Sequence, residues 1–198
     1  EDRPLARLVI TGVGGQGVLS AARWLGDAAV LAGQNVRVGQ LHGMSQRGGS
    51  VEATVSFGPG KSSFIRNGSA DALLAFEPLE LSRSAGKLAP GGAALVSSGR
   101  IVPFTLAQQG AGYPDIEAIF AAVRARGIAL TTVDGPALAA RAGAPRALNV
   151  IMLGALAGLG TLPFATDKLI EAMERRCPAR LLAANRRAFE LGIEAARC

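Results

Sequence analysis

The sequence predicts an α/β protein with a Rossmann-like, mostly parallel sheet flanked by helices and a helical C-terminal third. Over the first two thirds of the chain, short apolar runs bounded by glycine alternate with segments of helical spacing. From residue 148 onward, all the periodic segments are helical. Hydrophobic residues make up 49% of the chain but aromatic residues only 5%, so the core must be aliphatic. Such a core is typical of helices packed on a buried parallel sheet.

The first strand and the first helix have the clearest signals. Residues 8–10 form an apolar run that ends at a glycine, which is typical of a buried strand. Residues 18–32 carry small and apolar side chains at helical spacing and stop at Gly33, a residue favoured just after a helix. With a second strand at 36–38 they form a strand-loop-helix-strand unit. A right-handed crossover makes its two strands parallel.

The middle of the chain is expected to supply the remaining strands. Residues 40–49 are polar and glycine-rich, which predicts a loop. Residues 51–57 alternate apolar and polar side chains, which predicts a half-exposed strand at a sheet edge. The remaining predicted elements are strands at 71–76, 93–96 and 128–133 and helices at 78–87, 115–126, 136–142, 148–158, 166–176 and 178–196.

Length and charge limit the class of protein. A chain of 198 residues suffices for one well-buried core, so residues 1–198 are expected to form a single domain. Lys and Arg number 21 against 15 Asp and Glu, which gives a net charge of +6. The arginines lie scattered along helices without aromatic residues between them, a pattern that argues against nucleic-acid binding. An anionic ligand or an acidic partner surface accounts for the charge equally well.

The cysteines and the hydropathy exclude further classes. Cys177 and Cys198 are the only cysteines and form no C-x-x-C pair, so this chain alone cannot build a zinc site or a cysteine-ligated iron–sulfur cluster. The longest apolar stretch, 150–159, is too short to span a bilayer, and no signal-like segment opens the chain. We therefore expect a soluble, cytoplasmic protein with reduced thiols and no metal of its own.

The first candidate site is segment 12–17 (GVGGQG), between the first strand and the first helix. Glycines there permit a left-handed backbone and let N–H groups approach an anion at the positive end of the helix dipole. The spacing also matches the dinucleotide fingerprint G-x-G-x-x-G. That fingerprint expects an acidic residue after the second strand, but Gly39 and Gln40 stand there, which argues against NAD. A tight turn without a ligand is the alternative. The candidate residues are Gly12, Gly14, Gly15, Gln16 and Gly17.

The second candidate site is segment 42–49 (HGMSQRGG), expected beside the first at the carboxyl edge of the sheet. His42 is the only histidine and has no carboxylate or thiolate near it in sequence, so a structural, interface or proton-donating role is favoured over zinc binding. Arg47 lies between Gln46 and two glycines, and we expect it to bind an anion or to form a salt bridge to a partner. The candidate residues are His42, Met44, Ser45, Gln46, Arg47, Gly48 and Gly49.

Segments 12–18 (GVGGQGV) and 42–51 (HGMSQRGGSV) together resemble the γ-type domain of the 2-oxoacid:ferredoxin oxidoreductases, over essentially the whole chain. The second segment resembles in particular the β subunit of the indolepyruvate type. Pyruvate and 2-oxoglutarate relatives carry a different sequence around the Arg-Gly-Gly. Residues 97–112 carry no motif that we recognise.

The resemblance implies a reaction in which an arylpyruvate, coenzyme A and oxidised ferredoxin become an aryl-acetyl-CoA, carbon dioxide and reduced ferredoxin. It implies that thiamine diphosphate, magnesium and iron–sulfur clusters perform the chemistry. This chain lacks a Gly-Asp-Gly segment and has too few cysteines, so these cofactors are expected on a large partner subunit. The resemblance also associates the domain with coenzyme A, with the glycine segment and Arg47 facing the nucleotide or the active-site entrance. The alternatives are a stand-alone NAD(P)-dependent oxidoreductase and a purely structural assembly partner.

Overall fold

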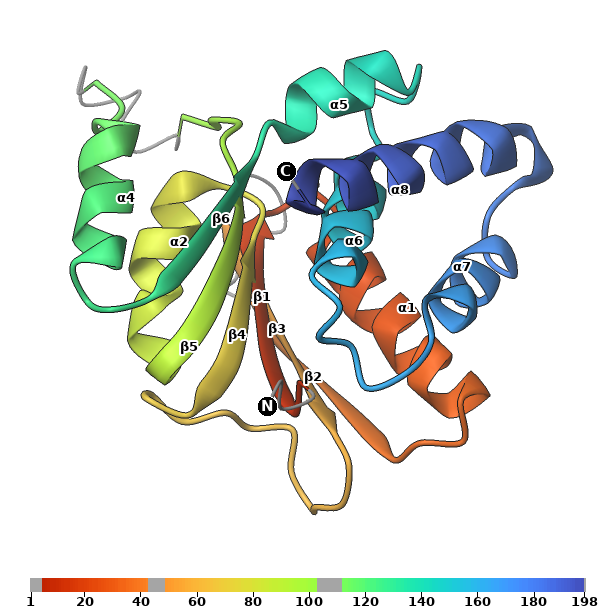
Figure 1. Ribbon diagram of the computed structural model, residues 1–198, viewed down its shortest axis with the longest axis horizontal. Helices are drawn as coiled ribbons and strands as arrows, with labels where there is room; N and C mark the ends of the chain where they lie inside the picture. Colours follow the sequence, from red (N-terminus) through yellow and green to blue (C-terminus); the bar gives the residue numbers. More distant parts are fainter. Residues whose placement is uncertain (1–4, 43–48, 103–111, 198) are drawn as a thin grey trace.

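The computed structural model describes residues 5–42, 49–102 and 112–197 (Figure 1). A six-stranded sheet with the strand order β2-β3-β1-β4-β5-β6 forms its centre. The pairs β1–β4, β4–β5 and β5–β6 are parallel, and β3 is antiparallel to both β1 and β2. The predicted mostly parallel sheet is therefore confirmed. Its strands are β1 (Arg7–Val13), β2 (Val36–His42), β3 (Ser50–Phe57), β4 (Ala70–Ala75), β5 (Leu88–Ser97) and β6 (Ala129–Val133).

Helices cover both faces of the sheet, and the predicted helical C-terminal third is confirmed. Figure 1 shows α2 and α4 on one face, α1, α6, α7 and α8 on the other, and α5 at the end of the sheet where β6 finishes. Among the described residues, no helix has both the length and the hydropathy that a membrane crossing requires. The helices are α1 (Val18–Leu31), α2 (Pro78–Ser84), α4 (Ile116–Arg124), α5 (Gly135–Arg141), α6 (Leu148–Gly158), α7 (Thr166–Glu174) and α8 (Leu182–Arg197), with 3₁₀ turns η1 (Ala85–Lys87) and η2 (Ala179–Leu181).

The end of α1 shows why the local sequence signals were reliable. Gly33 has a φ of +70°, a left-handed conformation that glycine adopts without steric cost. The Gly33 N–H donates to the Val30 carbonyl at 2.9 Å, and the Gln34 N–H donates to the Ala29 carbonyl at 2.9 Å. These two bonds form a Schellman motif, which satisfies carbonyls at the end of the helix. The glycine therefore ends α1 next to the residue where the sequence predicted its end.

Two predictions about β2 are wrong in part. Residues 40–42, predicted to lie in a loop, continue β2, because Gln40, Leu41 and His42 pair with Ala53, Glu52 and Val51 of β3. β2 runs in the same direction as β1, as the crossover requires, but it is not its neighbour. Instead, β3 lies between them and pairs with both. An antiparallel inserted strand is a non-local feature that hydrophobic periodicity does not reveal.

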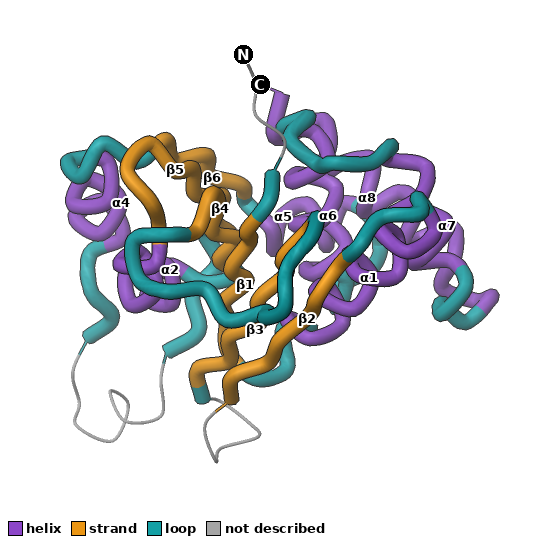
Figure 2. The backbone as a smooth tube through the Cα atoms, turned by 90° about the horizontal axis from the view of Figure 1, so that it is seen from below, coloured by secondary structure: helices purple, strands orange, loops and turns teal. Residues whose placement is uncertain are grey.

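The prediction that β3 is a half-exposed edge strand is also wrong. Its polar residues Thr54 and Ser56 are buried, with exposed fractions of 4% and 7%. The cover comes from the loop between β3 and β4, which Figure 2 shows crossing the sheet. Within this loop, Ile65 packs into the core beside Val9, and the Ser63 side chain lies against Gly39 of β2. The alternating pattern identified a polar face but could not show that a distant loop covers it.

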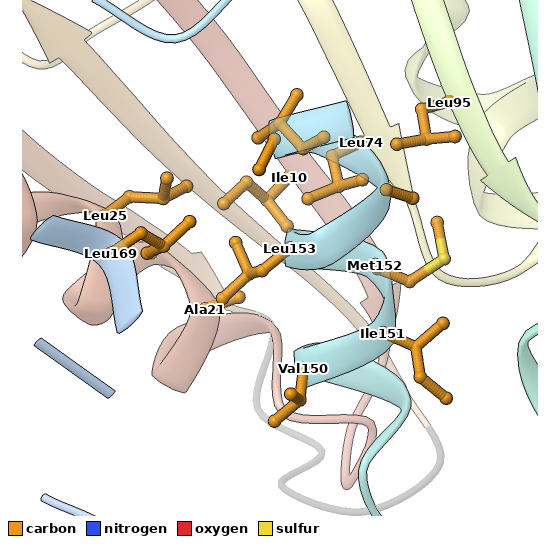
Figure 3. Close-up of a cluster of buried hydrophobic side chains, with 14 of the residues drawn as sticks. Ile10, Ala21, Leu25, Leu74, Leu95, Val150, Ile151, Met152, Leu153 and Leu169 are labelled. Carbon is orange, nitrogen blue, oxygen red and sulfur yellow. The ribbon is translucent and has the colours of Figure 1, made fainter. Parts of the chain in front are cut away.

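The larger of the two hydrophobic clusters surrounds α6. Every residue from 149 to 157 is buried and all but Asn149 are apolar, so this helix can only lie inside the protein. Its residues contact the sheet on one side and α1 and α7 on the other (Figure 3). The side chains labelled in that view are Ile10, Ala21, Leu25, Leu74, Leu95, Val150, Ile151, Met152, Leu153 and Leu169.

Helices α6 and α8 approach each other through glycines. A Cβ atom built at Gly154 would lie 2.1 Å from the Phe189 carbonyl oxygen of α8. A Cβ atom built at Gly192 would lie 2.1 Å from the Ile151 carbonyl oxygen of α6. Real Cβ atoms do not come this close to backbone atoms, so both positions require glycine. The two glycines let the helix backbones touch, and this contact holds α6 between the sheet and α8.

We predict that Gly192→Ala destabilises the protein, because the added methyl group forces α6 and α8 apart. Overpacking of this kind costs about 1–3 kcal/mol. A matched control is Gly86→Ala, since Gly86 is exposed, lies in η1 and has no atom within 4 Å of a built Cβ. Urea unfolding should show a lower free energy of unfolding for Gly192→Ala and little change for Gly86→Ala. Equal stability of the two variants would contradict the described packing.

Candidate functional site

The loop between β1 and α1 lies at the carboxyl edge of the central strand. Gly15 and Gly17 have φ values of +104° and +86°, in the left-handed region. No side chain caps the start of α1, and no acidic residue lies in its first turn. The N–H groups of that turn have no partner inside the helix and therefore create a region of positive potential at the start of α1. A Cβ built at Gly15 meets no atom of a described residue within 4 Å.

Gln16, a predicted ligand residue, uses its side chain to close the loop. Its Oε1 accepts a hydrogen bond from the Val13 N–H at 2.7 Å, and its Nε2 donates to the Phe76 carbonyl at 3.0 Å. The amide therefore ties the loop to the end of β4. Gly12 makes room for this bridge, since a Cβ there would lie 2.8 Å from Gln16 Oε1 and 3.0 Å from Phe76 Cβ. Gly12 and Gln16 thus set the shape of the loop.

The two glycine-rich segments meet at this edge. The Gly14 N–H donates to the Gly49 carbonyl at 2.9 Å, which joins the β1–α1 loop to the residue just before β3. His42 is the last residue of β2 and pairs with Val51 across the sheet. The other candidates of the second segment, Met44, Ser45, Gln46, Arg47 and Gly48, lie outside the described residues.

A groove of about 360 Å³, which we call the rim groove, opens beside the β1–α1 loop. Arg100 and Arg146 are exposed in it and form no ion pair or hydrogen bond with another described residue. Among the described residues, none that lines the groove is acidic. Arginine side chains beside a helix N-terminus and a glycine loop are suited to binding an anion. The lining residues are Gly15, Gln16, Gly99, Arg100, Ile101, Pro136, Pro145, Arg146 and Leu148.

A buried carboxylate, Glu77, supports the groove from the side of β4. It precedes α2 and is only 1% exposed. Its Oε2 accepts from the N–H groups of Leu79 at 2.7 Å and Glu80 at 3.2 Å, which caps the helix. Its Oε1 accepts from the Ile101 N–H at 3.3 Å and from the Tyr113 hydroxyl. Glu77 therefore holds both Ile101, which lines the groove, and Tyr113 against α2.

Sequence reasoning missed this network. Glu77 and Tyr113 lie 36 residues apart, and nothing in the local pattern links them. The available signal was a Glu directly before a Pro at a helix start, which is typical of an N-terminal cap with proline in the first turn. Burial, and next the hydrogen bond to Glu77 and its negative charge, raise the pKa of the Tyr113 hydroxyl well above its ordinary value of 10.0.

We predict that Tyr113 titrates abnormally in the folded protein. Its raised pKa means that the unfolded chain loses the proton first, so this contribution to stability is complete below about pH 10 and is lost as the pH rises further. Tyr113 is the only tyrosine, so tyrosinate absorbance reports on it alone. The absorbance of the folded protein should rise at higher pH than that of the urea-unfolded chain. If the titration curves of the folded and the unfolded protein coincide, the contact between Tyr113 and Glu77 is absent. The Tyr113→Phe variant, which has no tyrosine, gives the background absorbance.

Comparison with known proteins identifies the family. The family model of pyruvate ferredoxin/flavodoxin oxidoreductase matches residues 7–195. The indolepyruvate oxidoreductase subunit IorB of Methanothermobacter thermautotrophicus is 35% identical over 189 residues, covering 96% of this chain and 96% of the relative. The IorB subunit of Thermococcus kodakarensis is 40% identical over 192 residues, covering 96% of this chain and 95% of the relative.

Solved structures share the fold. The gamma subunit of a keto/oxoacid ferredoxin oxidoreductase from Geobacter sulfurreducens has a TM-score of 0.70 at 24% identity, covering 96% of this chain and 98% of that one. A 2-oxoglutarate:ferredoxin oxidoreductase from Magnetococcus marinus, with 2-oxoglutarate, coenzyme A and succinyl-CoA bound, has a TM-score of 0.73 at 20% identity. This match covers 98% of the present chain and 31% of that protein. From the family model and the sequence relatives together, the chain belongs to the pyruvate ferredoxin/flavodoxin oxidoreductase family.

Proposed function

We propose that this chain is the small subunit of an indolepyruvate-type 2-oxoacid:ferredoxin oxidoreductase, which converts arylpyruvates to aryl-acetyl-CoA. The similarity to the IorB subunits over almost the full length of both chains supports this function. Two cysteines are too few to hold an iron–sulfur cluster, so the proposal assigns the clusters and thiamine diphosphate with magnesium to a larger partner subunit. Ferredoxin takes up the electrons from the complex.

We infer the role of this chain within the complex from the rim groove. Coenzyme A is a polyanion, and the exposed guanidinium of Arg100 lies in the same groove as the left-handed Gly15 and the open N-terminus of α1. Backbone N–H groups and an arginine are suited to hold a diphosphate. We infer that the groove orients coenzyme A toward the partner's active site, with Arg47 of the adjacent segment as a second phosphate ligand. The proposal also includes His42 and Gly49 in this site, since the Gly49 carbonyl accepts a hydrogen bond from the Gly14 N–H.

The proposal also treats residues 1–198 as one γ-type domain working in the cytoplasm, where a free thiol such as Cys177 stays reduced. A stand-alone NAD(P)-dependent enzyme is not favoured. Gln40 continues β2 where a ribose-binding carboxylate would be expected, and the sequence relatives are oxidoreductase subunits. A purely structural partner remains the competing role, because glycines and arginines also fit a protein interface.

We predict that Arg100→Gln and Arg47→Ala each raise the KM for coenzyme A in the reconstituted complex about tenfold, the effect of losing one hydrogen bond to a charged group. Arg66→Gln is a control with the same charge change, on an exposed arginine of the loop between β3 and β4. Steady-state kinetics with varied coenzyme A, together with the yield of complex by size-exclusion chromatography, separate the two roles. An unchanged KM with a lower yield of complex would support the structural role instead.

A further inference from the structure

A second and larger pocket, of about 510 Å³, lies where the start of α6 meets α1, η2 and the first turn of α8. We call it the Trp24 pocket, after the tryptophan of α1 that lines it. Its volume lies in the range of sites that enclose a small-molecule ligand. More than half of its lining residues have aliphatic or aromatic side chains, among them Trp24, Val150, Leu181 and Ala184. The pocket is therefore suited to a ligand with an apolar body and few polar groups.

Arginine supplies every charged side chain that lines the Trp24 pocket within the described part of the chain. Arg176 forms an ion pair with Asp27, with 2.6 Å between Nε and Oδ2. Arg146 and Arg180 are exposed and form no ion pair or hydrogen bond with another described residue. Two unpaired guanidinium groups give the pocket a positive potential, and their planar forks of donors match the two oxygens of a carboxylate.

Asn149 adds a buried hydrogen-bond donor at the start of α6. The residue lines the pocket and is only 9% exposed. Its Oδ1 accepts from the Val150 N–H at 3.0 Å, which fixes the orientation of the amide. Its Nδ2 has no hydrogen-bond partner among the residues described. A buried donor without a partner is costly, so this amide indicates that the ligand brings an acceptor atom to the pocket.

Trp24 supplies an aromatic wall. It is half-buried and packs against the larger hydrophobic cluster, so the core holds it in place. Aromatic rings pair with one another in offset-stacked or edge-to-face arrangements and gain more from this than their buried area provides. An aromatic wall, two unpaired arginines and an unsatisfied amide donor in a mostly apolar lining together favour a small aromatic ring that carries a carboxylate.

We propose that the Trp24 pocket binds an aromatic carboxylate, either an arylpyruvate or an arylacetate. The identity of the acid rests on the proposed function, because the proposed reaction takes up arylpyruvates and forms aryl-acetyl groups. The aryl ring packs on Trp24 among the apolar side chains. Asn149 donates a hydrogen bond to a carboxylate oxygen, and Arg180 pairs with the carboxylate.

Arg146 couples this pocket to the rim groove. Pro145 and Arg146 line both cavities. A carboxylate bound in the Trp24 pocket attracts the Arg146 guanidinium and so removes part of the positive charge from the rim groove. The complex should therefore bind coenzyme A more weakly when the aromatic acid is present.

Calorimetric titration of the 198-residue chain tests the binding directly. The probes are phenylpyruvate and phenylacetate. Cyclohexylacetate, which lacks an aromatic face, should bind about two- to tenfold more weakly than phenylacetate. Phenylacetamide, which lacks the charge, should bind about two- to fivefold more weakly.

A matched pair of variants locates the site. Arg180→Gln should weaken the binding of phenylacetate about two- to fivefold, the effect of losing one exposed ion pair. Arg66→Gln, with the same charge change on the loop between β3 and β4, should leave it unchanged. Binding should also change the emission of Trp24, the only tryptophan of the chain. Of the two acids, the one that binds more tightly identifies whether the natural ligand carries the 2-oxo group.

The possible outcomes separate this inference from the proposed function. If neither acid binds, or if phenylacetate, cyclohexylacetate and phenylacetamide bind equally, the inference is overturned, and a raised KM for coenzyme A in Arg100→Gln still supports the proposed function. If the acids bind but Arg100→Gln and Arg47→Ala leave that KM unchanged, the Trp24 pocket stands and the role given to the rim groove fails.

Kinetics of the reconstituted complex test the coupling. Phenylacetate should raise the KM for coenzyme A about two- to fivefold, the effect of weakening one exposed charge contact, and should raise it less in Arg180→Gln. An equal rise in Arg180→Gln would show that the acid acts elsewhere in the complex and would overturn the coupling through Arg146.

Discussion

The backbone contact between α6 and α8 determines where the candidate site lies. Gly154 and Gly192 let the two helices touch, and this keeps the buried α6 between the sheet and α8. The first turn of α6 then reaches the carboxyl edge of the sheet, where Asn149 lies against Gly17. The connection before it places Arg146 in the rim groove. The candidate site therefore depends on a packing contact that involves no functional residue.

The glycines of segment 12–17 have different structural roles. Gly12 is required because Gln16 and Phe76 fill the space that a side chain would occupy, and Gly17 is required because Asn149 does. Gly15 has a left-handed backbone, and no atom of a described residue lies within 4 Å of a Cβ built there, so within the described part of the chain a ligand has room to approach. A pattern that resembles a nucleotide fingerprint can therefore consist largely of packing constraints. The segment is explained without assuming that every glycine contacts phosphate.

Features set by neighbouring residues were predictable from the sequence. The apolar run of β1, the spacing of α1 and the glycine that ends it each depend on a few adjacent residues. Features set by distant residues were not. The insertion of β3 between β2 and β1 and the cover of Thr54 by the loop that contains Ser63 have no local signature. Hydrophobic periodicity records which face is apolar, but not what lies against the other face.

The candidate site, too, was predictable only where neighbouring residues determine it. Segments 12–17 and 42–49 were found because their glycines are unusual in sequence, and the Gly14–Gly49 hydrogen bond joins them in space. Arg100, Arg146 and the contact between Glu77 and Tyr113 were not predicted, because nothing in the local sequence distinguishes these residues from others of their type. A site that combines residues from several distant elements can be recognised only from the three-dimensional structure.

The proposed function requires that coenzyme A bind this subunit at the carboxyl edge of its sheet. Hydrogen–deuterium exchange of the assembled complex, with and without coenzyme A, tests it most directly. We expect coenzyme A to slow exchange at residues 14–20 and 99–102 and to leave residues 58–69 of the loop between β3 and β4 unchanged. Unaltered exchange at the carboxyl edge, or protection confined to residues 58–69, would contradict the claim.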